Sequence, residues 1–231
     1  MTHYALNRRH AILQQYIQKF QLANVLPDVL LHAMTLEAFE KGERIITQGE
    51  MPHAIYFLVE GRSKVYTTSQ DGRSLILTFT TPFTVISDIE FIERRPYLNT
   101  VEAVTDGYYL KLPLTLVEQY GMQHLPFMTF MLKTLTRKFY DNANALHFNF
   151  LHSVDVRFAS YLLAMTHEEP NVPIHDLKDV AQMIGTSYRH LNRIIGQLSD
   201  AGYIERAQRT IRILNREQLL HLAKYNIYEE R

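Results

Sequence analysis

The feature that most constrains this chain is a pair of short apolar patterns near its C-terminus. Both patterns have helical spacing, the first at Leu177, Val180, Ala181 and Ile184, and the second at Leu191, Ile194, Ile195 and Leu198. Between them, Gly185 can end one helix and a hydroxyl residue can cap the next. Two amphipathic helices joined this tightly pack at a steep angle. The sequence therefore predicts a helix-turn-helix from about Asp176 to Leu198.

The outer face of the second predicted helix is polar. It carries Tyr188, Arg189, Asn192 and Arg193, with Ser187 at its start. Arginine can donate two hydrogen bonds to guanine, and asparagine pairs with adenine or a phosphate. Because such a helix presents its N-terminal outer face to the major groove, these residues are candidates for DNA contact. The alternative is an ordinary solvated helix face.

A basic hairpin is expected to follow. Ala201-Gly-Tyr-Ile-Glu leads through Arg206-Ala-Gln-Arg209 into Thr210-Ile-Arg-Ile-Leu, which is typical of the wing in a winged helix-turn-helix. The chain's net charge is zero, but residues 188–212 hold five arginines against two acidic residues. Arg206 and Arg209, with Arg212 as a further candidate, would contact phosphate without reading bases.

The N-terminal half changes from helical to β pattern. Helical spacing in the first thirty-five residues includes a short helix from Pro27 through Leu36. From Ala38 to about Leu112, β-branched and aromatic runs alternate with glycine-containing turns, which predicts an all-β barrel or roll. The chain as a whole is therefore expected to be α+β.

A long helix is predicted from Pro126, since proline suits a first helical turn. One stripe repeats along it four and three residues apart, at Met128, Leu132, Leu135, Phe139, Asn142 and Leu146. This spacing is typical of a coiled-coil seam, in which a buried asparagine can set the register. The alternative is a helix lying on its own core. A second helix covers roughly Val154 to Met165, and a connector follows from Glu168 to Pro173.

Composition excludes several classes of site. The chain has no cysteine, so disulfides, thiolate zinc sites and cysteine-ligated iron–sulfur clusters are ruled out. No histidines form a close pair at helical ligand spacing, and no catalytic motif is present. We expect no catalytic residue, metal or cofactor. Without a signal peptide or an apolar stretch of about 20 residues, a cytoplasmic location and no membrane partner are expected.

Four segments resemble one family of regulators. They are Phe39-Glu-Lys-Gly-Glu-Arg-Ile-Ile-Thr-Gln-Gly-Glu, Ile55-Tyr-Phe-Leu-Val-Glu-Gly-Arg, Val154-Asp-Val-Arg-Phe-Ala-Ser-Tyr-Leu-Leu and Gly185-Thr-Ser-Tyr-Arg-His-Leu-Asn-Arg. Together they resemble the cyclic-AMP receptor protein and fumarate–nitrate regulator (CRP/FNR) superfamily of transcription regulators. Within it, the YeiL-type subgroup is nearest.

The resemblance implies a cyclic-nucleotide-binding-like β-roll (jelly roll) with N-terminal helices at 1–125, a dimerisation helix at 126–151, and a winged helix-turn-helix at 152–231. It implies a homodimer on palindromic double-stranded DNA, with half-sites about 34 Å apart. RNA polymerase is a further candidate partner. Ser187, Tyr188, Arg189 and Arg193 fall where relatives contact DNA. The rival hypothesis is a regulatory module whose C-terminal helices bind protein.

The family's nucleotide site departs from its pattern here. The resemblance places Ser87 and Asp88 at a Gly-Glu pair that binds ribose, and Tyr97 and Leu98 at an Arg-Ser pair that binds the cyclic phosphate. Binding of cyclic AMP is therefore not expected. The candidate effector pocket comprises Ser87, Asp88, Tyr97, Asn99 and Asn142. Either it takes another small molecule, with an aromatic lining drawn from Phe79, Phe83, Tyr97 or Phe139, or the roll binds nothing.

Overall fold

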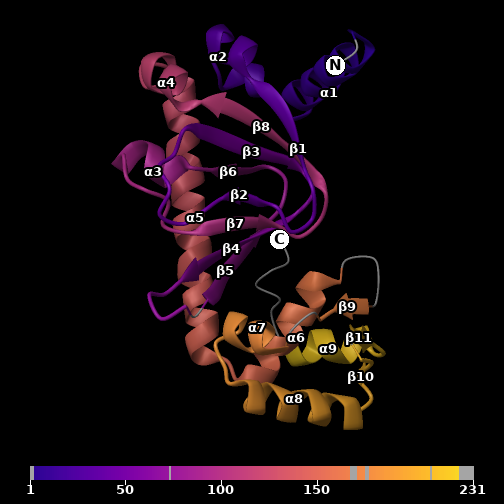
Figure 1. Ribbon diagram of the computed structural model, residues 1–231. Coiled ribbons are helices and arrows are strands. Elements are labelled where there is room, and N and C mark those ends of the chain that lie inside the picture. Colours follow the sequence, from indigo (N-terminus) through magenta and orange to yellow (C-terminus); the bar gives the residue numbers. More distant parts are fainter. Residues whose placement is uncertain (1–2, 73, 167–170, 175–176, 209, 224–231) are drawn as a thin grey trace. The chain divides into compact units, whose positions relative to one another are not determined.

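The computed structural model describes residues 3–72, 74–166, 171–174, 177–208 and 210–223. The chain forms two compact units. The first unit comprises residues 1–67 and 79–140, and the second comprises residues 68–78 and 141–231. Figure 1 shows the elements of each unit. The expected division at 125/126 and 151/152 stays a prediction.

The first unit begins with helices and then becomes a β-roll. Helix α1 (His3–Lys19), a 3-10 turn (Leu22–Asn24) and helix α2 (Asp28–Ala33) precede the first strand. The expectation that the second helix reaches Leu36 is wrong, because β1 (Thr35–Phe39) already begins at Thr35 and pairs antiparallel with β8. Leu36 and Phe39 are buried from within this strand.

Two four-stranded sheets build the roll (Figure 1). One has the order β1-β8-β3-β6 and the other β2-β7-β4-β5. The strands are β2 (Arg44–Ile46), β3 (Ala54–Glu60), β4 (Ser63–Thr68), β5 (Ser74–Thr80), β6 (Thr84–Ile86), β7 (Thr100–Ala103) and β8 (Gly107–Pro113). A short helix, α3 (Asp88–Glu93), follows β6. The predicted β-roll is confirmed.

Strand β3 separates two apolar clusters of the first unit. Alternate residues of a strand point to opposite faces. Ile55 and Phe57 accordingly join the cluster under the helices, whereas Tyr56 and Leu58 join the cluster inside the roll. The cluster inside the roll also contains Tyr97 and two further tyrosine or phenylalanine rings, Tyr109 and Phe39. The roll interior is therefore packed with both aromatic and aliphatic side chains.

A long helix, α5 (Leu125–Leu151), follows α4 (Leu114–Leu116) and a π-helical turn (Val117–Gly121). Phe127 and Met131 of α5 are buried in the cluster under the helices, and Met128 packs against it. The first part of α5 thus belongs to the core of the first unit. Among the described helices, none is both long and apolar enough to cross a membrane.

The second unit combines helices with a small antiparallel sheet. Its further elements are α6 (Val154–Met165), β9 (Asn171–Pro173), α7 (Leu177–Met183), α8 (Tyr188–Asp200), β10 (Ile204–Arg206), β11 (Thr210–Ile213) and α9 (Arg216–Ala223). The sheet has the order β10-β11-β9. The predicted helix-turn-helix and wing are confirmed. The expected connector at 168–173 instead ends in strand β9, which pairs with β11.

Candidate DNA-binding surface and sensor cassette

The turn between α7 and α8 is fixed by several hydrogen bonds. Gly185 has φ +69°, a left-handed conformation that favours glycine. The amide of Thr186 donates to the carbonyl of Ala181 at 2.8 Å, and the Ser187 hydroxyl accepts from the amide of His190 at 3.2 Å. Arg157 of α6 donates to the carbonyl of Ile184 at 2.7 Å. The start of α8 is therefore held in a defined direction.

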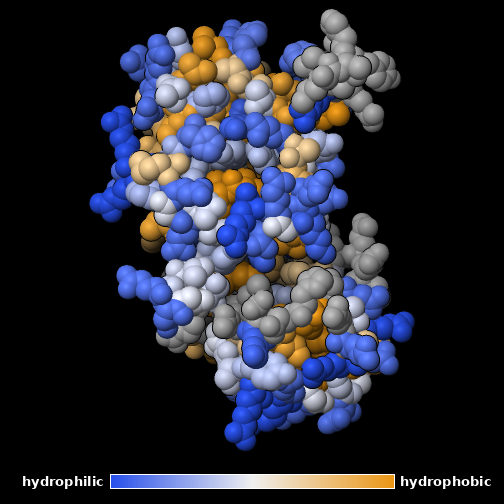
Figure 2. All heavy atoms as spheres, in the orientation of Figure 1, coloured by the Kyte–Doolittle hydropathy of each residue, from blue (hydrophilic) through white to orange (hydrophobic). Residues whose placement is uncertain are grey.

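Helix α8 divides cleanly into a buried and an exposed face. Leu191, Ile194, Ile195 and Leu198 are buried. On the other face Ser187, Arg189 and Arg193 are exposed, and Tyr188 is 45% exposed. Figure 2 shows hydrophilic side chains covering the lower edge of the view, over α8. The cationic and hydroxyl side chains of this face are therefore exposed to solvent.

Two side chains of α8 hold arginines. The Nη2 of Arg193 lies 3.0 Å from the Nε2 of His190, one turn earlier. The Nη1 of Arg206, on strand β10, donates to the Oδ1 of Asn192 at 2.8 Å. Asn192 is half-buried, whereas Arg206 is exposed. Of the seven predicted DNA-binding residues, six therefore share the α8 face or its contact with the wing, and Arg209 lies outside the described residues.

The wing itself is a two-stranded hairpin, with Arg206 opposite Ile211 and Glu205 opposite Arg212. Ile204 and Ile211 are buried and anchor it. Arg206 and Arg212 are both exposed. The anchored strands thus hold two exposed arginines, of which Arg206 lies beside α8, and exposed cations of this kind can contact phosphate.

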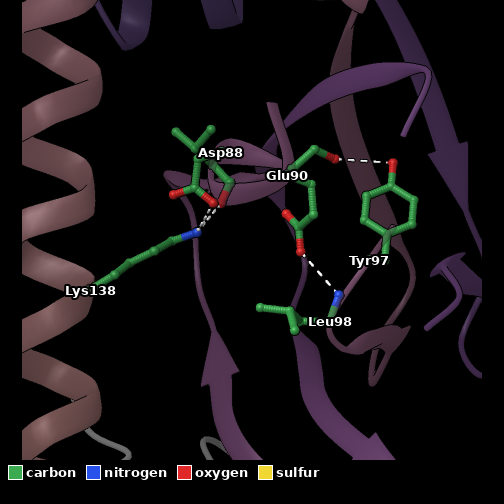
Figure 3. A network of polar contacts seen from close by, with 7 residues as sticks. Asp88, Glu90, Tyr97, Leu98 and Lys138 are labelled. Atoms are coloured by element: carbon green, nitrogen blue, oxygen red, sulfur yellow. Dashed lines mark hydrogen bonds and ion pairs between the residues drawn. The ribbon is translucent and has the colours of Figure 1, made fainter. Parts of the chain in front are cut away.

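In the first unit, the turn from β6 into α3 begins the segment that the resemblance assigns to nucleotide binding, and residues 87–99 are called the cassette below. Ser87 has φ +76° although it is not glycine, and it is almost fully buried. A left-handed conformation costs an L-residue about 1–2 kcal/mol. The Ser87 hydroxyl donates to the Tyr97 hydroxyl at 3.2 Å (Figure 3). Tyr97 thus extends into the cassette and bonds directly to its first residue.

Asp88 forms an ion pair with Lys138 of α5 (Figure 3). The Lys138 Nζ lies 2.8 Å from the Asp88 Oδ1 and donates to the carbonyl of Val85 at 2.6 Å. The Asp88 side chain is 3% exposed and that of Lys138 is 30% exposed. The other carboxylate oxygen, Oδ2, is buried and has no hydrogen-bond partner. One lysine therefore carries the charge compensation of the cassette.

Glu90 and Tyr97 close the opposite side of α3. The Glu90 Oε1 accepts from the amide of Leu98 at 3.2 Å, and both Glu90 and Tyr97 are buried (Figure 3). Burial raises the pKa of the Tyr97 phenol, and the hydrogen bond from Ser87 opposes this rise in part. The backbone of Tyr97 bonds to Glu50 at 2.9 Å and to Gly49 at 2.8 Å. Tyr97 is therefore a neutral, firmly held side chain.

The other predicted effector residues lie in different local environments. Asn99 is half-buried at the end of the cassette loop, and Asn142 is exposed on the section of α5 that belongs to the second unit. Phe83 stacks on Phe20 in the cluster under the helices, with their ring centroids 4.6 Å apart, whereas Phe139 is exposed. Phe79 is half-buried.

Sequence reasoning missed Lys138 and Glu90. A signal for Lys138 was present, because it follows buried Met131 by seven residues and so lies on the core-facing side of the helix. Among the described residues, no group of three histidine or acidic side chains could hold a metal ion.

The predicted seam residues of α5 differ in exposure. Leu132 is 66% exposed and Phe139 is 72% exposed, whereas Leu135 is half-buried and Met128 packs on its own unit. Asn142 is exposed, and the side chain of Leu146 lies outside the described set. Further along α5, Phe150 and Leu151 are also strongly exposed. Among the described residues, α5 therefore carries large apolar side chains that are exposed in the single chain.

Comparison with known proteins agrees with both halves of the structure. The cyclic nucleotide-binding domain model matches residues 36–124, and the Crp-like helix-turn-helix domain model matches residues 156–222. Regulatory protein YeiL of Escherichia coli O157:H7 is 27% identical over 179 residues, covering 78% of this chain and 81% of that protein.

Two further relatives extend the match. A CRP-like cAMP-activated global transcriptional regulator of Mycobacterium tuberculosis is 21% identical over 194 residues, covering 80% of this chain and 87% of that protein. A solved structure from Eubacterium rectale, assigned to the crp/fnr family of transcriptional regulators, has a TM-score of 0.80 at 18% identity. It covers 88% of this chain and 98% of the solved chain.

A cyclic-nucleotide-binding-like roll, a long helix and a helix-turn-helix with a wing define a transcription regulator with its own DNA-binding domain. The chain belongs to the CRP/FNR superfamily of such regulators.

Proposed function

We propose that this regulator is a cytoplasmic homodimer that reads a palindromic operator without cyclic AMP. The exposed face of α8 carries the DNA-reading part of the proposal. Arg189 and Arg193 stand on that face with Tyr188, and Arg206 of the wing bonds to Asn192 on the same helix. Such donors can read base edges in the major groove, and the wing would contact phosphates without reading sequence.

The exposed apolar residues of α5 support a homodimer. Leu132 and Phe139 are seven residues apart, on the same side of the helix, and both are mostly solvent-exposed in the single chain. Burying large apolar side chains contributes roughly 1.5–3 kcal/mol each. A second copy of α5 would cover both residues symmetrically, and a symmetric dimer matches a palindromic operator.

The occupied cassette supports independence from cyclic AMP. Asp88 and Glu90 are buried there, and Lys138 is already bonded to Asp88 and to Val85. A cyclic phosphate would add a further negative charge beside two carboxylates, and burying an unpaired charge costs several kcal/mol. Tyr97, which offers a neutral hydroxyl, stands where the resemblance places the phosphate-binding arginine.

The proposal is tested by selecting an operator from random double-stranded DNA with the full chain. We expect a palindromic consensus and an affinity that falls steeply as salt rises, because phosphate contacts release counterions. Light scattering of the free protein should give twice the mass of one chain. Binding that is absent or insensitive to salt would instead favour the rival function, a module whose C-terminal helices bind protein.

A further inference from the structure

The side-chain amide of Asn192 makes two hydrogen bonds inside the second unit. Its Oδ1 accepts from the Nη1 of Arg206 at 2.8 Å, and its Nδ2 donates to the carbonyl of Tyr188 at 3.1 Å. An asparagine that reads adenine must offer one acceptor and one donor to the base together. Each of these atoms makes one hydrogen bond here and keeps one further lone pair or N–H, so the orientation of the amide is set by Arg206 and by the backbone of α8.

The same contact joins two elements that are distant in sequence. Asn192 lies on α8, and Arg206 ends strand β10. The strand is anchored by buried Ile204 and by its pairing with β11, in which Arg206 stands opposite Ile211. The backbone of Arg206 is therefore fixed by the hairpin, and the hydrogen bond from its guanidinium to Asn192 fixes the end of its side chain relative to α8.

Arg206 keeps donors for DNA while it holds this contact. A guanidinium has five N–H donors in a planar fork, and one bond to Asn192 engages a single nitrogen. The side chain is exposed, so the remaining donors face solvent. An arginine fixed before binding loses less conformational entropy when it meets a phosphate.

We propose that Asn192 is a positioning residue that sets Arg206 for phosphate contact, and that it does not read a base. This inference rests on the proposed DNA-binding function. Through it, the phosphate contact of the wing and the base-reading arginines of α8 keep one register on the duplex. It removes Asn192 from the set of residues expected to determine the operator sequence.

A double-mutant cycle tests this role. The variants Asn192→Ala, Arg206→Ala and the double variant are titrated with the selected operator and with each single base-pair change of it. Gln197→Ala is the matched control, since Gln197 is another amide exposed on α8. Urea unfolding of each variant checks that the fold is retained.

We expect each single variant to weaken operator binding by roughly 5- to 10-fold, the order of one lost contact. The double variant should bind no more weakly than Arg206→Ala, and the base preferences of Asn192→Ala should match those of the wild type. Gln197→Ala should bind like the wild type.

Two results would overturn the positioning role. The first is loss of preference at one base pair in Asn192→Ala together with effects that multiply in the double variant, which would make Asn192 a base reader. The second is wild-type affinity in Asn192→Ala. Failure of the wild type itself to bind any DNA would overturn the DNA-binding function, and it is recognised before any variant is compared.

Discussion

The face of α8 and the cassette around α3 use polar side chains in opposite ways. On α8 the cations Arg189 and Arg193 are exposed. In the cassette Asp88 and Tyr97 are buried and bonded to other residues of the same unit. In the pattern of the CRP/FNR superfamily, each of these two regions corresponds to a binding site. The cations of α8 are therefore exposed to solvent, whereas the polar groups of the cassette already bond to other groups of the same unit.

The difference has an electrostatic cause. A duplex carries its charge at the surface, so exposed cations can meet it without being desolvated first. A buried phosphate, by contrast, needs a cation that is not already committed. Lys138 is the cation of the cassette, and it is bonded to Asp88 and Val85.

The largest expected effect comes from the uncovered face of α5. Phe139→Asp should abolish the dimer, because it removes apolar burial and places two like charges across the proposed seam. A monomer meets one half-site only, so operator affinity should fall by about 100-fold or more. Sedimentation and DNA titration measure the two effects. Arg137→Asp, exposed on the same helix, should remain dimeric; a Phe139→Asp variant that stays dimeric would place the seam elsewhere.

Removal of the ion pair in the cassette comes next. Lys138→Met leaves Asp88 buried without its compensating charge, which should destabilise the protein by about 3 kcal/mol. This is the lower end for a buried pair, because the lysine is partly exposed. Urea unfolding measures the loss. The double variant Lys138→Met with Asp88→Asn should recover most of it, and a stable single variant would mean that the cassette does not depend on Lys138.

Arg189→Ala should then cost about 1–3 kcal/mol of operator binding and relax the preference at one base pair. The reason is that an exposed arginine at the start of α8 is placed to donate two bonds to guanine. Titration of operators with single base-pair changes measures it. A loss that is uniform across all of these operators would make Arg189 a phosphate contact.

The smallest effect should come from the cap of α8. Ser187→Ala removes the acceptor for the amide of His190 and should destabilise the helix by about 1 kcal/mol. Amide hydrogen exchange in α8 reports this loss, and Ser187→Thr should restore protection. Unchanged exchange in Ser187→Ala would show that the cap contributes little to α8.

Local pattern predicted most of the fold, because each element is encoded by neighbouring residues. The apolar spacing and the glycine at 185 predicted α7, α8 and their turn, and β-rich runs predicted the roll. The end of α2 was misplaced because no helix breaker separates Ala33 from Thr35. Strand β9 was missed because three residues form it only by pairing with β11, far along the chain.

The site was predicted less completely, because sequence patterns report on neighbouring residues and the site depends on contacts between distant ones. Residue type and helical face predicted the exposed arginines of α8. The pairs Asp88–Lys138 and Asn192–Arg206 depend on contacts between elements that are separated in sequence. Local spacing carries no information about them, so these two contacts are visible only in the folded chain.

The central claim is that the polar groups of the nucleotide cassette already bond to other groups of the protein, and that the DNA-binding surface needs no cyclic AMP to bind its operator. Its most direct test is a titration of the selected operator by the full chain, with and without a saturating amount of cyclic AMP. We predict tight, salt-dependent binding with the same dissociation constant in both titrations. Binding that occurs only with cyclic AMP, or becomes many-fold tighter with it, would contradict the claim.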